Sequence, residues 1–435
     1  MERTIYKKLL AWKDSSDRKP LVLLGARQVG KTYILEEFGH REFDNIVKIV
    51  CHNNPFAQTL FSDFNILRIV HAIELYYEVN IESGHTLLFF DEIQDAPNAI
   101  SSLKYFCEDM RQLHVVAAGS LLGISLKENE SYPVGKVNTL NMFPMTFTEF
   151  LSGIGRPRLS QAIVNGDWEM LNTLHGLLVE MLRQYYFVGG MPEAVAKWAE
   201  TADPKKVRQV QHDILDTYYR DFGKHGRTMI HRIRQAWDII PAQLAKGNKK
   251  FIFGMIKKGA RAADFESAIQ WLVDAGLIYK VYRANAPKYP LKFYKDSDAF
   301  KIFLLDCGLL AYLSDTRPQD MLIGDNAFTE FKGAFTENFF QQELAAMEEA
   351  PSYYYSKDNS QQEIDFLVQY DGRVTPCEVK AETNVKSKSL STFVRADWAE
   401  LQLTGLRVSM QPYVDQGWMQ NIPIYAIESF FHSKG

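Results

Sequence analysis

One short segment near the start of the chain restricts the possible folds more than any other. It is the octet Gly25-Ala26-Arg27-Gln28-Val29-Gly30-Lys31-Thr32, which has every fixed residue of the pattern GxxxxGK[ST]. Glycines at these positions let the backbone wrap a polyphosphate, and consecutive N–H groups then point inward at it. Lys31 would reach the β- and γ-phosphates of ATP, while the Thr32 hydroxyl would bind Mg²⁺. The octet and the adjoining Tyr33 are therefore the predicted nucleotide-binding segment.

The residues on either side of this octet provide the context that such a loop needs, because the loop must follow a strand and open a helix. Leu21–Leu24 is a continuous apolar run, which is typical of a strand buried on both faces of a parallel sheet. Ile34, Leu35 and Phe38 follow at helical spacing, and the N-terminus of that helix would add its positive dipole to the phosphate site. A chance glycine-rich turn is the alternative, and the flanking strand and helix argue against it.

The size and charge of the chain limit the other possibilities. A chain of 435 residues is too long for one hydrophobic core and predicts about two to four domains. Hydrophobic residues make up 46% and charged residues 23% of the chain, as in an ordinary soluble globular protein. The net charge of −4 argues against a nucleic-acid binder that is basic throughout, but it leaves room for a local basic groove.

Nothing in the sequence indicates a membrane protein or a secreted, disulfide-linked protein. The first residues lack the apolar core of a signal peptide, and no apolar stretch approaches the roughly 20 residues that cross a bilayer. The four cysteines, Cys51, Cys107, Cys307 and Cys377, are far apart and show no CxxC spacing. We therefore expect buried, reduced thiols in a cytoplasmic protein without a membrane partner.

A second apolar run, Thr86-Leu87-Leu88-Phe89-Phe90, leads directly into Asp91 and Glu92. Downstream of a phosphate-binding loop, such a strand predicts that Asp91 holds Mg²⁺, usually through water, and that Glu92 polarises the water that attacks the γ-phosphate. By itself the pattern would indicate only a buried strand that meets solvent at an acidic turn. The distance from the loop, which leaves room for one strand and its helices, favours the catalytic interpretation.

Two further strands complete the expected ATPase sheet. His114–Ala118 is apolar and is followed by Gly119 and Ser120. A polar side chain at that strand tip would lie beside the γ-phosphate, so Ser120 is a candidate sensor of the phosphate or of the attacking water. The alternative is that Ser120 caps the next helix. Residues 137–142 are the expected fifth strand.

Four segments carry a resemblance to a known family, namely GARQVGKT, LLFFDEIQ, AAGS and GKVNTLNMFPMTFTEFL. They resemble the bacterial and archaeal ATPases of the AAA superfamily whose C-terminal half is a domain of unknown function. The resemblance runs from about residue 18 almost to the end of the chain. It implies a sheet with the strand order of the additional-strand ATPases and self-association into a homo-oligomer. It also implies a C-terminal half made of a winged helix and a restriction-endonuclease-like fold.

One position departs from that family. Its members usually have Gly-Arg just before the last strand of the ATPase core, whereas this chain has Gly135-Lys136. Lysine cannot make the bidentate contact that arginine gives to a transferring phosphate. If this position acts on a neighbouring subunit, we expect slow hydrolysis, unless another arginine substitutes. The available arginines include Arg156, Arg158 and Arg220.

The fold class we expect is α/β, in four regions. They are a P-loop ATPase core with a parallel sheet in residues 1–155, a helical lid region in 156–225, a winged-helix domain in 226–320, and a PD-(D/E)xK nuclease-like α/β domain in 321–435. Within the lid region, the segment Gly189-Gly190-Met191-Pro192 also resembles the family. A structural turn between two helices is the favoured interpretation of this segment.

The winged-helix prediction rests on three expected helices, at 233–244, 253–256 and 264–273, and on a hairpin whose return strand would be 291–294. Basic residues cluster near the third helix and would suit phosphate contacts; they are Lys246, Lys249, Lys250, Lys257, Lys258 and Arg261. The third helix itself is acidic and offers little to read bases. Packing or oligomerisation is therefore favoured over sequence-specific DNA binding.

The last region has the order of elements of a PD-(D/E)xK nuclease centre. Asp365 lies in one expected strand, and Glu378-x-Lys380 lies in the next. Asp365 and Glu378, with a backbone carbonyl, would hold Mg²⁺, and Lys380 would orient or deprotonate the attacking water. Glu337, from the preceding helix, could add a metal contact. Glu-x-Lys is common on exposed strand edges, so the order of the elements carries this prediction rather than the triplet itself.

The predicted function is Mg²⁺-dependent ATP binding and hydrolysis, coupled to a nuclease-like domain that acts on or binds DNA or RNA. The alternative is an ATP-dependent switch whose C-terminal half docks protein or nucleic acid without cleaving it. A third hypothesis is a stand-alone regulator whose winged helix binds an operator. The cofactors expected in the first two cases are ATP and Mg²⁺.

Overall fold

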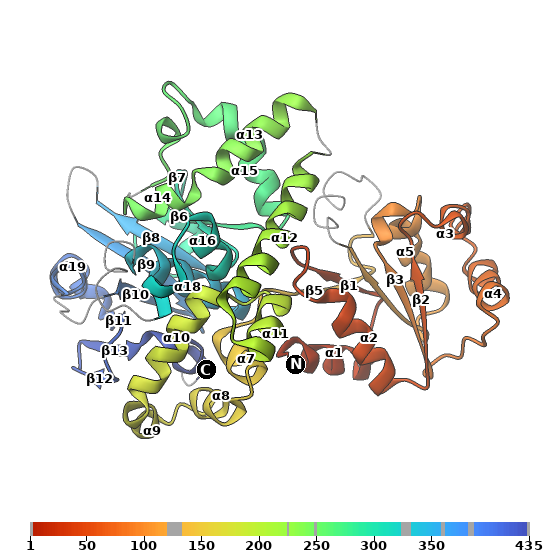
Figure 1. Cartoon of the computed structure of the whole chain (residues 1–435), viewed down its shortest axis with the longest axis horizontal. Helices are drawn as coiled ribbons and strands as arrows, with labels where there is room; N and C mark the ends of the chain where they lie inside the picture. Colours follow the sequence, from red (N-terminus) through yellow and green to blue (C-terminus); the bar gives the residue numbers. More distant parts are fainter. Residues whose placement is uncertain are drawn as a thin grey trace. The chain divides into compact units, whose positions relative to one another are not determined.

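The computed structural model describes residues 3–119, 133–223, 226–247, 250–322, 332–357, 362–381 and 387–432. The chain divides into two units, whose elements are labelled in Figure 1. The N-terminal unit contains residues 2–143 together with 274–276, and the larger unit contains residues 144–273 and 277–435. Among the residues that the structure describes, no helix is long and apolar enough to span a membrane.

A five-stranded sheet forms the centre of the N-terminal unit. Its strands are β1 (Leu21–Leu24), β2 (Asn45–Val50), β3 (Thr86–Asp91), β4 (His114–Ala118) and β5 (Asn138–Asn141). Their order is β2-β3-β4-β1-β5, and each neighbouring pair is parallel. β4 therefore lies between β1 and β3, which is the order that the resemblance implies. Because these strands are parallel, the carboxyl ends of β1 and β3 lie at the same end of the sheet, on either side of β4.

Helices cover both faces of this sheet (Figure 1). They are α1 (Ile5–Asp14), α2 (Lys31–Glu42), α3 (Pro55–Leu60), α4 (Ile66–Tyr77), α5 (Ala99–Asp109) and the short 3-10 helix η1 (Ile93–Asp95). α2 packs against β2, β3 and β4. On the other face, α3, α4 and α5 share an apolar core with the strands, in which Ile49, Phe90 and Phe106 are fully buried. Burial on both faces explains why β1 and β3 are continuous apolar runs.

An eight-stranded mixed sheet forms the framework of the larger unit. Its strands are β6 (Ile278–Ala284), β7 (Lys295–Leu304), β8 (Ser352–Ser356), β9 (Glu363–Tyr370), β10 (Arg373–Lys380), β11 (Gly405–Ser409), β12 (Val414–Asp415) and β13 (Met419–Pro423). Their order is β12-β13-β11-β10-β9-β8-β6-β7. The pairs β10–β11, β11–β13 and β6–β8 are parallel, and the other neighbours are antiparallel.

The rest of the larger unit is mainly helical. Its α-helices are α7 (Phe147–Gly153), α8 (Pro157–Val164), α9 (Trp168–Thr173), α10 (His175–Val188), α11 (Pro192–Thr201), α12 (Pro204–Phe222), α13 (Arg227–Asp238), α14 (Ile240–Ala245), α15 (Ala262–Asp274), α16 (Cys307–Leu313), α17 (Pro318–Leu322), α18 (Lys332–Met347), α19 (Lys388–Thr392) and α20 (Ile427–His432). Shorter turns are η2 (Phe253–Met255), η3 (Leu291–Tyr294), η4 (Phe393–Asp397), η5 (Ala399–Leu401) and η6 (Ile424–Ala426). α18 lies along the sheet and packs against β6, β7 and β10 (Figure 1).

The structure corrects two details of the expected winged helix. The helix expected at 233–244 is divided into α13 and α14, because Pro241 near the start of α14 has no N–H to continue the α13 ladder. The return strand of the hairpin is β7, and the expected strand at 291–294 is instead the turn η3. Pro290 precedes this turn, and the Leu291 N–H donates to the Gln369 side chain rather than to β6. The hairpin β6–β7 also pairs with β8, so it forms one edge of the eight-stranded sheet.

The Gly189-Gly190 segment is a tight turn between α10 and α11, and its contacts agree with the structural interpretation. The Gly190 N–H donates to Asp306 Oδ2 at 2.5 Å. A Cβ at Gly190 would lie 2.1 Å from the Met145 carbonyl oxygen. Gly189 has φ 78°, and a Cβ there would lie 2.2 Å from Asp306 Oδ1. Only glycine fits both positions, because each backbone is pressed against other atoms of the larger unit.

Candidate functional site

The predicted phosphate-binding loop connects β1 to α2, as its sequence requires. Three of its residues adopt left-handed backbone angles: Gly25 has φ 145°, Gln28 has φ 67° and Gly30 has φ 98°. A Cβ at Gly25 would lie 2.2 Å from the carbonyl oxygen of Met142, so this position has room for glycine alone. Gly30 is the N-cap of α2, which places the end of the loop at a helix N-terminus. This is the geometry in which a helix dipole and backbone N–H groups favour an anion.

Lys31 is held inside its own loop. Its Nζ donates to the carbonyl oxygens of Gly25 at 2.8 Å and Ala26 at 2.7 Å, and the residue is 7% exposed. Burial lowers the pKa of Lys31 to about 8, although the carboxylates of Glu92 and Asp91 act in the opposite direction. Lys31 thus has neutral acceptors and no direct ion pair among the described contacts. Phosphate oxygens would be stronger acceptors for its ammonium group than these carbonyl oxygens.

The loop and the acidic strand meet at one place. The Thr32 hydroxyl donates to Asp91, with distances of 3.2 Å to Oδ1 and 3.3 Å to Oδ2. Asp91 is the last residue of β3 and is 7% exposed. A hydroxyl and a carboxylate in contact are oxygen ligands of the kind that Mg²⁺ prefers. These two residues therefore fit the magnesium role that the sequence predicts for them.

Lys48, on β2, is a member of this site that the sequence interpretation missed. Its Nζ lies 3.1 Å from Asp91 Oδ2 and 2.8 Å from Glu36 Oε1. Burial opposes its charge, but the hydrogen bonds to Glu36 and Asp91 outweigh burial and raise the pKa of Lys48. The signal was present in the sequence, because a single lysine interrupts the otherwise apolar run Ile46-Val47-Lys48-Ile49-Val50.

Glu92, the predicted base, follows β3 in a left-handed conformation with φ 51°. Its Oε2 accepts a hydrogen bond from Gln94 Nε2 at 2.7 Å. Gln94 was not singled out from the sequence, although it lies only two residues away. A left-handed backbone at a residue other than glycine costs on the order of 1 kcal/mol, and such strain is common at functional sites. The hydrogen bond from Gln94 fixes the direction of the carboxylate.

The other predicted members of the nucleotide site have different outcomes. Ser120 lies outside the described residues. Tyr33 is on α2 with 60% exposure. Lys136 forms an ion pair with Glu108 at 2.8 Å, and this hydrogen bond raises the pKa of Lys136. Arg220, one of the three candidate arginines, pairs with Asp216 one turn earlier on α12 at 2.6 Å.

In the larger unit, β9 and β10 bring the predicted nuclease residues together. Asp365 Oδ2 accepts a hydrogen bond from the Val379 N–H at 2.8 Å. Glu378 is 5% exposed, and its Oε1 lies 3.1 Å from Lys380 Nζ. The second oxygen of Glu378 has no hydrogen-bond partner among the residues that the structure describes. The Asp and the Glu-x-Lys segment are therefore neighbours, as the sequence predicts.

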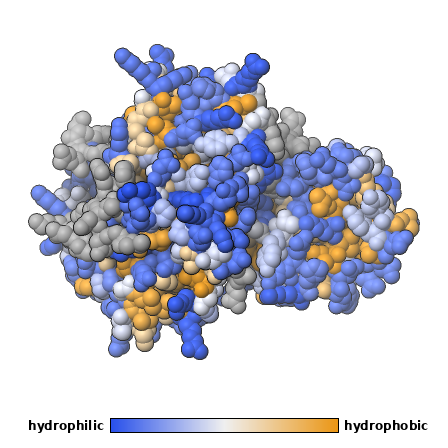
Figure 2. Space-filling view, in the orientation of Figure 1, coloured by the Kyte–Doolittle hydropathy of each residue, from blue (hydrophilic) through white to orange (hydrophobic). Residues whose placement is uncertain are grey.

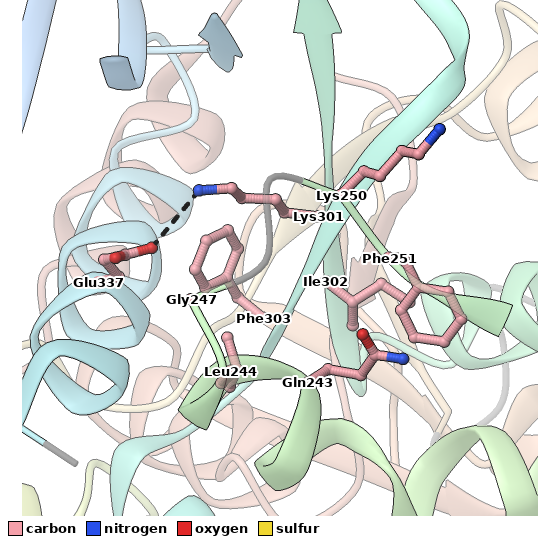
Figure 3. Close-up of a pocket in the computed structure, with 9 residues that line it drawn as sticks. All are labelled: Gln243, Leu244, Gly247, Lys250, Phe251, Lys301, Ile302, Phe303 and Glu337. Carbon is pink, nitrogen blue, oxygen red and sulfur yellow. Dashed lines mark ion pairs between the residues drawn. The ribbon is translucent and has the colours of Figure 1, made fainter. Parts of the chain in front are cut away.

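Lys301, on β7, joins this cluster and was not predicted. Its Nζ lies 2.7 Å from Glu363 Oε1 and 3.7 Å from Glu337 Oε2. Figure 3 shows the Lys301–Glu337 ion pair in a pocket, while the nearby Lys250 points away from it. The carboxylates of Glu337, Glu363 and Asp365 outweigh the effect of burial and raise the pKa of Lys301. In turn, burial and the charge of Glu337 raise the pKa of Asp365 to about 7, against the opposing effect of Lys301.

The predicted magnesium ligands of the larger unit, Asp365 and Glu378, each have other partners in the structure. Within the described residues, no three His, Cys, Asp or Glu side chains converge closely enough to hold a metal ion. Glu337 points to Lys301, and one oxygen of Glu378 faces Lys380. The carboxylates are thus accompanied by ammonium groups of the chain itself.

The basic residues near α15 lie at the surface of the larger unit. Lys246, Lys250, Lys257, Lys258 and Arg261 are exposed, whereas Lys249 lies outside the described residues. In Figure 2, strongly hydrophilic side chains protrude over α13–α15. Acidic residues accompany them, and Asp264 lies 3.9 Å from Arg232.

Three segments of the chain match protein families. Residues 17–151 match an AAA domain. Residues 179–320 match a domain of unknown function, DUF8612, and residues 332–427 match another, DUF4143. The first match contains the whole five-stranded sheet and its loop, so the N-terminal unit has an AAA-type P-loop ATPase domain. No curated protein matches the chain.

Solved structures of three proteins show limited similarity to this chain. The Walker-type ATPase PABY2304 of Pyrococcus abyssi is 15% identical with a TM-score of 0.45, over 72% of this chain and 95% of that chain. The ORC1 protein of Aeropyrum pernix, solved in complex with DNA, is 12% identical with a TM-score of 0.29, over 72% and 90%. The RuvB Holliday junction branch migration motor of Thermotoga maritima is 15% identical with a TM-score of 0.31, over 67% and 90%. At these TM-scores the similarities carry no argument about function.

Proposed function

We propose that the protein binds ATP together with Mg²⁺ at the loop 25–32 and hydrolyses it at the end of β3. The contact between the Thr32 hydroxyl and the Asp91 carboxylate carries this proposal, because it joins the loop to the acidic strand. A glycine-rich turn without a ligand would not need a hydroxyl and a buried carboxylate at the same point. The match of residues 17–151 to an AAA domain supports the proposal.

Each side chain then has a role that follows from its position. The loop N–H groups and the N-terminus of α2 hold the phosphates, and Lys31 exchanges its two carbonyl acceptors for phosphate oxygens. Thr32 and Asp91 hold Mg²⁺, which neutralises charge on the phosphates when bound. Glu92 accepts a proton from the attacking water, and Gln94 keeps its carboxylate in place.

A pair of variants tests this proposal. Glu92→Gln should keep ATP affinity within about threefold and reduce the hydrolysis rate by about 10²- to 10⁴-fold, because it removes the base and little binding. Asp91→Asn should weaken the Mg²⁺ dependence of binding as well. ATP binding is measured by calorimetry and hydrolysis by phosphate release. Unchanged hydrolysis in Glu92→Gln would refute the proposed role of Glu92.

A second candidate function is nucleic-acid binding by the larger unit, and the exposed basic residues near α15 favour it. Such binding would be mainly electrostatic, so its affinity should fall by at least about tenfold between 50 and 200 mM salt. The Lys257→Ala/Lys258→Ala double variant should weaken it, whereas Lys197→Ala, a change at an ion pair on α11, serves as the control. If the double variant binds DNA and RNA as tightly as the control Lys197→Ala does, Lys257 and Lys258 do not belong to a nucleic-acid-binding surface.

A further inference from the structure

Lys301 is a buried lysine that no step of ATP hydrolysis uses. The residue is 8% exposed and lies in the apolar strand segment Ala299-Phe300-Lys301-Ile302-Phe303-Leu304. Lysine is almost never buried this deeply without a partner, because removing an ammonium group from water is costly. The ammonium group of Lys301 must therefore have partners that balance its charge in the interior of the larger unit.

The surroundings of Lys301 Nζ have the character of a cation site. Glu363 Oε1 lies at 2.7 Å, Glu337 Oε2 lies at 3.7 Å, and the ring centroid of Tyr354 lies at 5.3 Å. These groups come from β9, α18 and β8, while the lysine comes from β7. Two carboxylates and the face of an aromatic ring are all groups that attract a positive charge.

The same cluster contains the residues of the nuclease pattern. Asp365 follows Glu363 by two residues on β9, and its carboxylate accepts from the Val379 N–H of β10. Glu378 and Lys380 are an ion pair on β10. A divalent ion placed among these carboxylates would meet two ammonium groups that are already there. Among the described residues, one oxygen of Glu378 has no hydrogen-bond partner, which is the strongest argument for a metal. Against it, Lys301 and Lys380 already supply positive charge to the carboxylates of Glu363 and Glu378.

We infer that the ammonium group of Lys301 is the resident cation of this carboxylate cluster and takes the place of a divalent metal. The larger unit is then complete without Mg²⁺ and does not cleave phosphodiester bonds. Its nuclease-like order of elements serves as a scaffold, as in the alternative function in which this half of the protein docks a partner. The inference does not depend on ATP hydrolysis by the N-terminal unit.

The test uses Mn²⁺ as the probe on the full chain, without nucleotide. In the Mn²⁺ measurements every protein carries Asp91→Asn, which removes the carboxylate of the nucleotide site; the protein with this change alone is the background protein. Free Mn²⁺ is counted by electron paramagnetic resonance, and Tm is measured with EDTA and with millimolar Mn²⁺. The background protein should bind no Mn²⁺ in the larger unit and should keep the same Tm in both conditions.

Lys301→Met removes the resident cation and leaves its carboxylates. This variant should lose at least about 5 °C in Tm in EDTA, recover most of that loss with Mn²⁺, and bind one Mn²⁺. Lys197→Met is the matched control, because Lys197 forms an ion pair with Glu200 of the same 2.7 Å length, but with a side chain that is 36% exposed. It should behave as the background protein does. The inference would be overturned by a folded Lys301→Met variant that binds no Mn²⁺ and has the same Tm with and without it.

The background protein decides the question even if Lys301→Met does not fold. Stoichiometric Mn²⁺ binding in the background, abolished by Asp365→Asn, would show that the cluster takes a metal with Lys301 present and would overturn the inference. DNA or RNA cleavage by the wild-type protein with Mg²⁺ or Mn²⁺, abolished by Glu378→Gln, would also overturn it. Absence of Mn²⁺ binding supports it, and ATP affinity, measured separately, reports on the nucleotide site alone.

Discussion

Lys31 and Lys301 are two buried lysines whose partners differ, and the difference separates a site that needs a ligand from one that does not. Lys31 donates to carbonyl oxygens of its own loop, which are neutral and can be exchanged for phosphate oxygens. Lys301 lies against the carboxylates of Glu363 and Glu337, which already balance its charge. Burial accordingly lowers the pKa of Lys31 to about 8, whereas carboxylates raise that of Lys301. Lys31 is therefore ready to exchange its acceptors for those of a ligand, whereas Lys301 already has its counter-charges within the chain.

Stability should show the largest contrast between the two lysines. Lys301→Met breaks a buried ion pair and leaves carboxylates without compensation, so the free energy of unfolding should fall by about 3–5 kcal/mol. Lys31→Met removes a charge that burial already disfavours and should cost less than about 1.5 kcal/mol, the worth of its hydrogen bonds. Urea unfolding of the nucleotide-free proteins measures both. Equal losses would show that the two lysines are held in the same way.

ATP affinity should show the reverse contrast. Lys31→Ala should weaken ATP binding at least about 100-fold, or about 2.7 kcal/mol, because the phosphates lose a charged donor. Lys301→Arg, which keeps a cation in the larger unit, should leave ATP affinity unchanged. Calorimetry with Mg²⁺ present provides both values. Retained micromolar affinity in Lys31→Ala would refute the assignment of the phosphate-binding loop.

The sequence predicted the N-terminal unit better than the larger unit, and the reason is physical. The loop between β1 and α2 is local in sequence, so its glycines and the flanking apolar runs were enough to define it. Thr32 meets Asp91 because β1 and β3 are parallel and end at the same end of the sheet. In the larger unit, Lys301 and Glu363 are far apart in sequence and meet only because β6–β7 joins the sheet beside β8. No local pattern contains that pairing.

A common signal nevertheless marked both of the missed lysines. Lys48 interrupts the apolar run 46–50 of β2, and Lys301 interrupts the apolar second half of β7, residues 299–304. A strand buried on its faces can accept such a residue when carboxylates of neighbouring elements are present. The sequence therefore indicates that each lysine has acidic partners, although it cannot name them. The return strand was misplaced, because residues 291–294 follow Pro290 and form the turn η3, while the strand β7 begins at Lys295.

The pH dependence of ATP binding should sharpen the contrast further. The pKa of Lys31 is about 8 in the nucleotide-free protein, and bound phosphates would raise it. Above pH 8, binding must then take up a proton, so affinity should fall by up to about tenfold per pH unit, while below pH 8 this group contributes no slope. Lys31→Arg should remove that slope, because arginine stays charged. A pH-independent affinity of the wild-type protein between pH 7 and 9 would contradict this role.

Lys31 should also make the stability of the nucleotide-free protein depend on pH. Its pKa is lowered from 10.5 in the unfolded chain to about 8 in the folded protein. Between these values the unfolded state binds more protons than the folded state, so the contribution of Lys31 to stability rises with pH. Lys31→Met should flatten the stability profile in this window. ATP affinity, in contrast, should fall as the pH rises above 8, so the stability and binding measurements can be told apart.

Substitution of Lys48 should have the smallest effect, because Lys48 shares features with both Lys31 and Lys301. Its Nζ pairs with Asp91 and Glu36, as a structural lysine does, but Asp91 also belongs to the nucleotide site. Removing this charge by Lys48→Met leaves Asp91 more negative towards Mg²⁺. We expect half-maximal hydrolysis at about two- to fivefold lower Mg²⁺, which corresponds to the modest energy of a partly exposed pair, about 0.2–1 kcal/mol. Lys13→Met, at the Lys13–Glu42 ion pair away from the loop, is the control and should leave the Mg²⁺ requirement unchanged. A higher Mg²⁺ requirement in Lys48→Met would mean instead that Lys48 holds Asp91 in the position that the metal needs.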